Sequence, residues 1–262
     1  MDFPLLFVRG QSVPVLLPDA VIDSGPTPGL LETMRGAAGR VPLWPYHRAR
    51  LLRAGRVAAA LLEEIESFLS AILPSLNERC LRLRLRLGHL QFDEPPHWDL
   101  SIEPLSAPVA MDNGITLHLC QTRLPKMDGP NPGCKELARS RYNRAMSELP
   151  VSDLLHDGLL LDEQGDLVET LRCNLLLRFA GRWHTPDLSR CGVRGVMRDW
   201  LAERTPIDEC PLNLTSLTSA EEVAVCNSVR GVLPVRALAG IKVWHPGPQV
   251  KHLQNLVAEE LW

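Results

Sequence analysis

Lysine is scarce in this sequence, and one lysine stands where it could do amine chemistry. Of the 28 lysines and arginines only four are lysines, and none of them precedes Lys126. Arginine stays charged, whereas a desolvated lysine can lose its proton and act as a nucleophile or a base. Lys135 lies in the segment PGCKELARSRYNRA, after a loop rich in proline, glycine and charge, and at the predicted start of a helix that extends to Glu148. The alternative interpretation is a solvated surface charge.

The elements that must position this lysine are predicted to be a mixture of strands and helices. The run LRLRLRL at Leu81–Leu87 alternates strictly, which is typical of a strand with one buried face, and its three arginines share the other face. That row of arginines is either an anion-binding patch or the solvated side of a sheet. Apolar residues recur at helical spacing from Leu51 to Ile72, and Pro74 ends this predicted helix.

A change of pattern at Ser106–Gly114 predicts a boundary between two domains. Residues 1–107 would form an N-terminal α/β domain, and residues 113–262 would form a C-terminal α/β domain. Because strands and helices are mixed in both halves, the predicted fold class is α/β or α+β.

The composition and the cysteine content are those expected of an ordinary soluble protein of the cytoplasm. Hydrophobic residues make up 45% and charged residues 23%, and a formal net charge of −3 gives no reason to expect a nucleic-acid or membrane partner. No apolar run approaches the ~18 residues of a membrane-spanning helix, and the N-terminus lacks the basic region of a signal peptide. The seven cysteines are irregularly spaced and no metal-binding motif accompanies the histidines, so we expect reduced thiols and no metal.

The most specific feature of the sequence is a series of short motifs in a fixed order. Between Asp157 and Leu201 the motif residues are Asp162, Gly165, Val168, Glu169, Asn174, Thr185, Pro186, Gly192, Gly195 and Arg198. Further motifs are GLLETMR at Gly29–Arg35, HRARL at His47–Leu51, KELARSRYNRA at Lys135–Ala145 and CNSVRGVLPV at Cys226–Val235. Together they resemble the fold-type IV pyridoxal-phosphate enzymes, also called class IV aminotransferases, over nearly the whole chain.

This resemblance implies a fold, a cofactor and a partner. The fold would be the two-domain, D-amino-acid aminotransferase-like fold, in which a C-terminal pseudo-barrel domain carries the reactive lysine. The cofactor would be pyridoxal 5'-phosphate, and the protein would be a homodimer, because sites of this family are built at a subunit interface.

The resemblance also implies roles for individual residues. Lys135 would form the Schiff base with the cofactor and act as the base, and Glu169 would keep the pyridine nitrogen protonated. The phosphate would be bound by Arg50, by the backbone of Gly195, Val196 and Met197, and by Asn227 and Ser228. Without the motifs, Arg50 reads as a charge on a helix face, Glu169 as a surface acid and Ser228 as a turn hydroxyl.

Within the family the motifs are most similar to those of the 4-amino-4-deoxychorismate lyases. The implied reaction converts 4-amino-4-deoxychorismate into 4-aminobenzoate and pyruvate, a step toward folate. Thr33 would then relay a proton or orient the substrate, although a threonine that packs in a strand is an equal interpretation. The alternatives are an aminotransferase of branched-chain or D-amino acids and a degenerate protein that binds the cofactor without turnover.

Three positions differ from the family pattern and bear on the substrate. Leu87-Gly88 stands where an arginine-glycine pair is usual, Ser24–Gly29 replaces the usual loop, and Arg172 replaces a small residue. Arg172 would either narrow the pocket or supply the missing positive charge. The candidates for contact with the substrate are Glu32 and Arg35, which lie in the motif GLLETMR, and Arg172.

Overall fold

The computed structural model describes residues 3–13, 29–76, 80–88, 97–105, 114–127, 133–151 and 153–262. Its contacts group into two compact units. Unit 1 comprises Met1–Ala107, Cys134–Ala138 and Trp262, and unit 2 comprises Pro108–Gly133 and Arg139–Leu261. The predicted boundary at residues 106–113 and the altered loop at residues 24–28 lie outside the described residues.

Unit 1 is built on a five-stranded antiparallel sheet in the order β2-β1-β5-β4-β3. The strands are β1 (Leu5–Val8), β2 (Gln11–Val13), β3 (Leu30–Gly36), β4 (Leu81–Gly88) and β5 (His97–Pro104). The leucines of β4 are fully buried, and the arginines between them point to the opposite side of the sheet. The predicted strand with one buried face is thereby confirmed.

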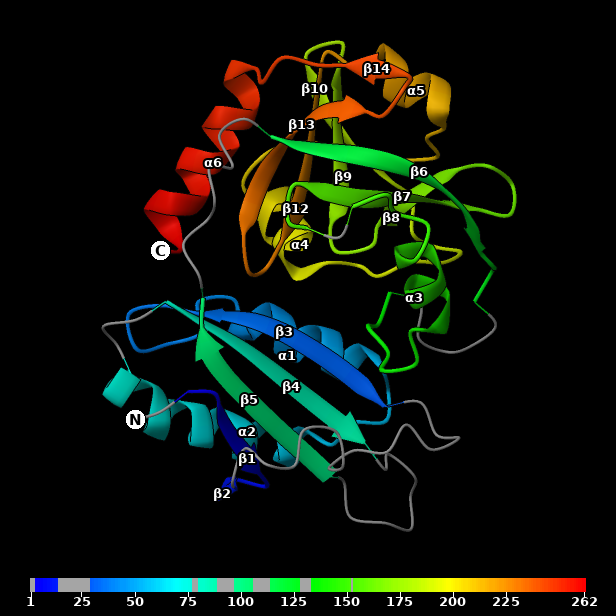
Figure 1. Ribbon diagram of the computed structural model, residues 1–262. Helices are drawn as coiled ribbons and strands as arrows, with labels where there is room; N and C mark the ends of the chain where they lie inside the picture. The colour runs from blue at the N-terminus through cyan, green and yellow to red at the C-terminus, as the bar shows by residue number, and fades with distance from the viewer. Residues whose placement is uncertain are drawn as a thin grey trace. The chain divides into compact units, whose positions relative to one another are not determined.

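The leucine face of this sheet is covered by the helices of unit 1 (Figure 1). These are α1 (Trp44–Arg53), α2 (Ala59–Ile72) and the short 3-10 helix η1 (Leu73–Leu76). The prediction of one helix that starts at Leu51 is wrong, because a short non-helical connection separates the end of α1 from the start of α2. Gly55 in that connection has a φ of +66°, a left-handed conformation that glycine adopts at little cost.

Unit 2 is built on a nine-stranded, curled sheet in the order β11-β10-β9-β12-β13-β6-β7-β8, with β14 paired to β13. The strands are β6 (Ile115–Leu124), β7 (His156–Asp162), β8 (Leu167–Thr170), β9 (Asn174–Phe179), β10 (Arg182–Pro186), β11 (Ile207–Cys210), β12 (Glu222–Asn227), β13 (Gly231–Leu238) and β14 (Lys242–Val243). Leu159, Leu175 and Val225 are completely buried inside the curl.

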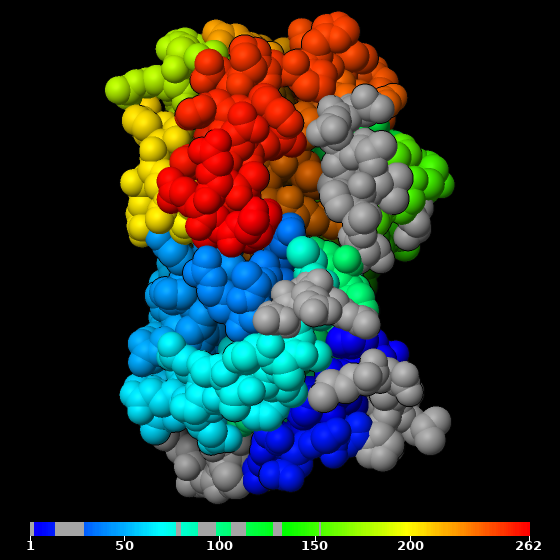
Figure 2. Space-filling model, turned by 90° about the vertical axis from the view of Figure 1, so that its left-hand side faces the viewer, coloured from blue at the N-terminus to red at the C-terminus, as the bar shows by residue number. Residues whose placement is uncertain are grey.

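The helices of unit 2 are α3 (Ser140–Met146), α4 (Val196–Ala202), α5 (Leu214–Ser219) and α6 (Pro248–Glu260). Helix α6 packs on β12 and β13 and forms part of the surface of the unit (red in Figure 2). None of the helices that the structure describes is long and apolar enough to cross a membrane.

The segment around Lys135 is extended, so the prediction of a helix that starts at this residue is wrong. The Leu31 amide donates to the Lys135 carbonyl at 2.9 Å, and the Leu137 amide donates to the Gly29 carbonyl at 2.8 Å. The segment therefore pairs with the start of β3, and the helix begins only at Ser140. These contacts place Lys135 in unit 1, whereas the sequence assigned it to the C-terminal domain.

Candidate functional site

The predicted site residues divide between the two units. Unit 1 holds Glu32, Thr33, Arg35, Arg50 and Lys135. Unit 2 holds Glu169, Arg172, Gly195, Val196, Met197, Asn227 and Ser228.

In unit 1, Lys135 lies beside a hydroxyl group. Its Nζ donates to the Thr33 Oγ1 at 3.3 Å, although the two residues are 102 positions apart in the chain. Both side chains are partly exposed, so solvent or a ligand can reach them. The pairing of Leu31 with Lys135 sets this distance, because it fixes the lysine backbone next to β3.

A buried charge cluster lies on the helix side of β3, formed by Glu32, His47 and Arg50. The Arg50 Nε donates to Glu32 Oε1 at 2.9 Å, and its Nη2 donates to Glu32 Oε2. The His47 Nδ1 is 2.5 Å from the same Oε2. All three side chains are at most 5% exposed, so the two hydrogen bonds from Arg50 hold its guanidinium in one orientation.

The protonation states of this cluster follow from its charges. Burial alone would raise the pKa of Glu32, but the charges of Arg50 and His47 and their hydrogen bonds hold it at about 2. Burial lowers the pKa of His47, although the charge of Glu32 and its hydrogen bond act to raise it. A neutral His47 that donates Nδ1–H to Glu32 leaves Nε2 without a proton, and within the described part of the chain Nε2 has no partner.

Two residues of unit 1 that were predicted to contact the substrate, Glu32 and Arg35, have partners within that unit. Glu32 is 1% exposed, and both of its oxygens bind Arg50 or His47. The Arg35 guanidinium lies over the Trp262 ring, 4.3 Å from its centre, and its Nη2 is 3.5 Å from the Cys80 Sγ. The structure thus gives Glu32 the role of orienting Arg50, whereas Arg35 stays partly exposed on the other side of β3.

In unit 2, Glu169 is a buried carboxylate held by two donors. It lies one residue before the end of β8 at 4% exposure, and its Oε1 accepts from the Tyr142 hydroxyl at 2.5 Å and from the Val193 amide at 3.1 Å. Burial, followed by the charge of Glu169, raises the pKa of Tyr142 well above its usual range, so Tyr142 remains a donor. The carboxylate is therefore fixed in position and is not the surface acid of the alternative interpretation.

The residues before α4 form a tight turn against Asn174. The Asn174 Nδ2 donates to the Val193 carbonyl at 2.8 Å, and a Cβ on Gly195 would lie 1.9 Å from the Asn174 Oδ1. No side chain of the described residues caps the helix at Gly195. The side chains of Val196 and Met197 are buried, so only their backbone N–H groups are suited to bind an anion.

We expect Gly195→Ala to lower the free energy of unfolding by about 2 kcal/mol, because the added methyl group overpacks against Asn174. The backbone itself is unstrained there, with a φ of −73°. Thermal unfolding of Gly195→Ala, Asn174→Ala and the double variant measures the effect. In the Asn174→Ala background the alanine should cost little; an equal cost in both backgrounds would contradict this explanation.

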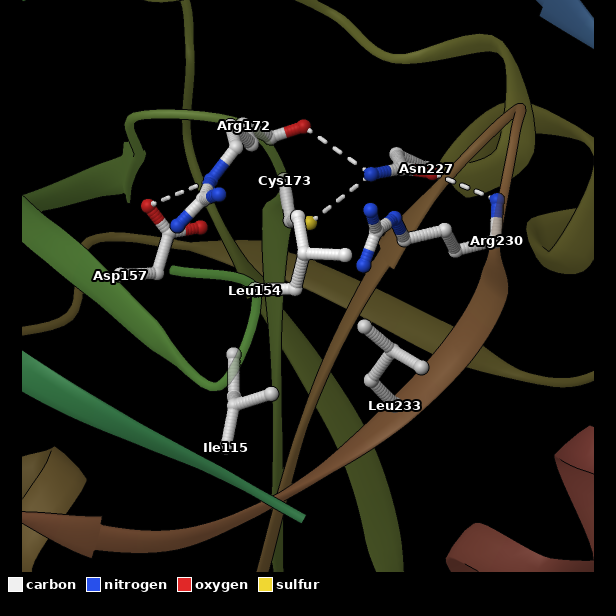
Figure 3. A pocket seen from close by; sticks show the side chains of 8 residues that line it. All are labelled: Ile115, Leu154, Asp157, Arg172, Cys173, Asn227, Arg230 and Leu233. Carbon is white, nitrogen blue, oxygen red and sulfur yellow. Dashed lines mark hydrogen bonds and ion pairs between the residues drawn. The ribbon is translucent and has the colours of Figure 1, made fainter. Parts of the chain in front are cut away.

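Asn227 and Arg172 organise one small pocket of unit 2 (Figure 3). The Asn227 Oδ1 accepts from the Val229 and Arg230 amides at 3.0 and 2.8 Å and so shapes the turn that contains Ser228. The other lining residues include Ile115, Leu154, Asp157, Cys173 and Leu233.

Arg172 is anchored by acceptors of its own unit. It reaches the Asp157 Oδ1 at 3.4 Å, the Asp153 carbonyl at 3.0 Å and the His156 carbonyl. Asp157 is 3% exposed, and burial raises its pKa although Arg172 opposes this shift. These contacts tie the start of β7 to the β8–β9 connection, which is a structural use of the arginine that the sequence did not suggest.

Sequence reasoning gave no role to His47 or Tyr142. Both lie inside the motif segments, at the start of HRARL and within KELARSRYNRA. Their roles depend on Glu32 and Glu169, which are 15 and 27 positions away in the chain, so no local pattern indicates them.

The residues of each unit fit pyridoxal phosphate by their chemistry. Unit 1 supplies an amine beside a hydroxyl and an oriented arginine suited to a phosphate. Unit 2 supplies a fixed, buried carboxylate suited to a pyridine nitrogen. It also supplies the N-terminus of α4, which follows Gly195 and has no side-chain cap among the described residues.

Comparisons with known proteins agree with this chemistry. Residues 29–238 match the family model for amino-transferase class IV. A curated aminodeoxychorismate lyase from Vibrio harveyi is 32% identical over 136 residues, which are 49% of this chain and about half, 48%, of that relative.

Solved structures match over nearly the full length. The 4-amino-4-deoxychorismate lyase from Pseudomonas aeruginosa is 32% identical, with a TM-score of 0.84 over 98% of this chain and 99% of that one. A branched-chain aminotransferase candidate from Thermotoga maritima is 22% identical, with a TM-score of 0.79 over 99% and 98%. The latter likeness concerns the fold alone. These matches confirm the predicted resemblance and fold, and the family match confirms pyridoxal 5'-phosphate as the cofactor.

Proposed function

We propose a specific reaction for this chain, which belongs to the class IV aminotransferase family. The reaction is the conversion of 4-amino-4-deoxychorismate into 4-aminobenzoate and pyruvate. The full-length likeness to the Pseudomonas aeruginosa lyase supports it. The observation that carries it is the 3.3 Å contact of Lys135 Nζ with Thr33 Oγ1, because this reaction needs a base and a proton donor side by side.

The residues proposed to hold the cofactor are those that the resemblance indicates. Lys135 would bind its aldehyde carbon, Glu169 would pair with its pyridine nitrogen, and Arg50 would bind its phosphate. The backbone N–H groups at Gly195, Val196 and Met197 and the turn at Asn227 and Ser228 would add donors to the phosphate. When bound, the cofactor supplies an electron sink that acidifies the hydrogen on the amine-bearing carbon of the substrate.

Lys135 and Thr33 would move the protons. The neutral amine of Lys135 removes the hydrogen from the amine-bearing carbon. The bond between the neighbouring ring carbon and the ether oxygen then breaks, and its electron pair leaves with the enolpyruvyl oxygen. Thr33 donates its hydroxyl proton to that oxygen and recovers a proton from Lys135 across the 3.3 Å contact. The ring becomes aromatic, and the released enol becomes pyruvate.

Aromatisation supplies much of the driving force of this reaction. The chain therefore needs mainly to position the substrate beside one good base. The backbone pairing of Leu31 with Lys135 serves this purpose, since it fixes the base relative to Thr33.

Thr33→Val tests the role of the hydroxyl. We expect kcat to fall by about 10²-fold, because valine keeps the branched shape and removes the proton donor. Thr33→Ser is the matched control and should largely retain kcat. The assay follows 4-aminobenzoate by its fluorescence and pyruvate by coupling to lactate dehydrogenase. Equal activity of the two variants would assign Thr33 to packing alone.

The same assay decides between the lyase and an aminotransferase. Wild-type protein supplied with pyridoxal phosphate should release 4-aminobenzoate and pyruvate in equal amounts. Keto acid production from branched-chain or D-amino acids, with no 4-aminobenzoate, would contradict the proposed reaction and favour an aminotransferase.

We also propose a cytoplasmic homodimer, on the basis of the family resemblance. All seven cysteines, each of which is within the described residues, are free thiols, which suits a reducing compartment. Light scattering on the purified protein tests the assembly, and a mass of one chain would contradict it.

A further inference from the structure

The sheet of unit 1 has one face that its helices do not cover. Directly paired residues of antiparallel strands project from the same side of a sheet. Thr33 pairs with Arg84 on β4, and Arg84 pairs with Ser101 on β5. Lys135 reaches the same face, because its amine binds the Thr33 hydroxyl. Arg84 is therefore the cross-strand neighbour of the residue that contacts the reactive lysine.

The two arginines beside Arg84 on β4 each face a carboxylate on β5. Arg82 pairs with Glu103, and its Nε lies 2.8 Å from the Glu103 Oε1. Arg86 pairs with Asp99, and its Nε lies 2.8 Å from the Asp99 Oδ1. The partner of Arg84 is Ser101, which carries no charge. Among the described residues the Arg84 guanidinium has no hydrogen-bond or ion-pair partner.

This face has an excess of positive charge. Among the described residues its cations are Arg35, Arg82, Arg84, Arg86 and Lys135, and its carboxylates are Asp99 and Glu103. Burial lowers the pKa of Arg84, and the charges of Arg86 and Arg82 lower it further. A guanidinium remains protonated despite such a shift, so its five donors and its charge are available to an anion.

We propose that Arg84 binds a carboxylate of the substrate, on the sheet face that carries Thr33 and Lys135. The inference rests on the proposed function, in which the product carries an amine and a carboxylate at opposite ends of an aromatic ring. An amine placed at Lys135 directs that carboxylate away from the lysine. Arg84 lies one strand away from Thr33, and neighbouring strands are about 4.8 Å apart, so its long side chain can meet the carboxylate there.

The altered position Leu87 fits this assignment. Its side chain is completely buried among the leucines on the helix side of the sheet. An arginine at that position of this strand would therefore point away from Thr33. Side chains alternate along a strand, so only positions that lie an even number of residues away from Arg84 point to the face of the reactive lysine.

Arg84→Gln, compared with Arg48→Gln on α1, tests the proposal. Arg48 is a partly exposed arginine of the helix side, 3.9 Å from Glu66. The test measures the calorimetric Kd of 4-aminobenzoate and of aniline, which lacks the carboxylate, together with kcat and KM. Arg84→Gln should raise the Kd of 4-aminobenzoate and KM by about 10- to 100-fold, as expected for a lost charge-assisted contact. The Kd of aniline, kcat and the absorbance of the bound cofactor should stay unchanged.

Thermal unfolding separates binding from a structural role. Because Arg84 is flanked by two like charges, Arg84→Gln should leave Tm unchanged or raise it. A lower Tm together with an unchanged Kd for 4-aminobenzoate would mean that the arginine serves the fold, and the proposal would be overturned.

The failure of this inference and the failure of the proposed function give different results. Wild-type protein that releases 4-aminobenzoate, with an unaltered Kd and KM in Arg84→Gln, keeps the function and rejects the role of Arg84. Wild-type protein that releases no 4-aminobenzoate rejects the function. The role of Arg84 is then still tested by the Kd of 4-aminobenzoate. Equal Kd values for the wild type and for Arg84→Gln would overturn the inference in this case too.

Discussion

Lys135→Ala is expected to abolish the visible absorbance of protein-bound pyridoxal phosphate and to lower the rate of 4-aminobenzoate formation by about 10⁴-fold or more. The alanine removes both the amine that would bind the cofactor and the base beside Thr33. Absorbance spectra with added cofactor, followed by the fluorescence assay, measure both losses.

Lys126→Ala is the matched control for this experiment. Lys126 is an exposed lysine of unit 2, and its removal should change neither the spectrum nor the rate. A Lys135→Ala protein that keeps the absorbance band would mean that the scarce lysine at this position is a surface charge. The assignment of the cofactor site to Lys135 would then fail.

Glu32→Gln is expected to cost about 3–5 kcal/mol of stability, the largest effect on folding that we predict. Glutamine has nearly the same shape but lacks the charge, so the buried guanidinium of Arg50 loses its carboxylate. Denaturation at neutral pH measures the loss. Glu66→Gln is the control, since Glu66 is 49% exposed and 3.9 Å from Arg48, and such surface pairs contribute at most about 1 kcal/mol.

The same carboxylate makes the stability depend on acid. The pKa of Glu32 is about 2 in the folded chain and 4.5 in its ordinary state, so the unfolded chain binds the proton first. The free energy of unfolding of the wild type should therefore fall as the pH drops from about 4.5 toward 2, by about 3 kcal/mol from this group. Glu32→Gln lacks this titration, so a wild type and a variant with parallel pH profiles in this range would contradict the prediction.

His47 adds a second loss of stability on acidification, which begins at a higher pH than the loss from Glu32. Burial lowers its pKa below the ordinary 6.5, so on acidification the unfolded chain takes up this proton before the folded chain does. Stability from this group is present above pH 6.5 and declines as the pH falls below that value.

Local patterns in the sequence determined the family, the cofactor and some strands. The alternation of LRLRLRL predicted the two faces of β4 correctly, because a strand repeats every two residues and needs no distant partner to show it. The spaced motifs indicated the cofactor, because each motif is a short segment whose residue types are suited to contact one part of pyridoxal phosphate. The helix predicted from Lys135 failed because Cys134–Ala138 takes its hydrogen bonds from β3 instead of from the next turn of its own segment.

Tertiary structure decided which side chains meet within each unit. Lys135 contacts Thr33 across 102 positions, Tyr142 contacts Glu169 across 27, and Arg50 contacts Glu32 across 18. The register of β3 against β4 placed Arg84 beside Thr33, and a shift of one residue would have turned it to the helix side. The sequence alone was enough to predict which side chains could take part in the chemistry of this protein. Their distances follow from strand register and backbone pairing, which depend on partners that no local pattern identifies.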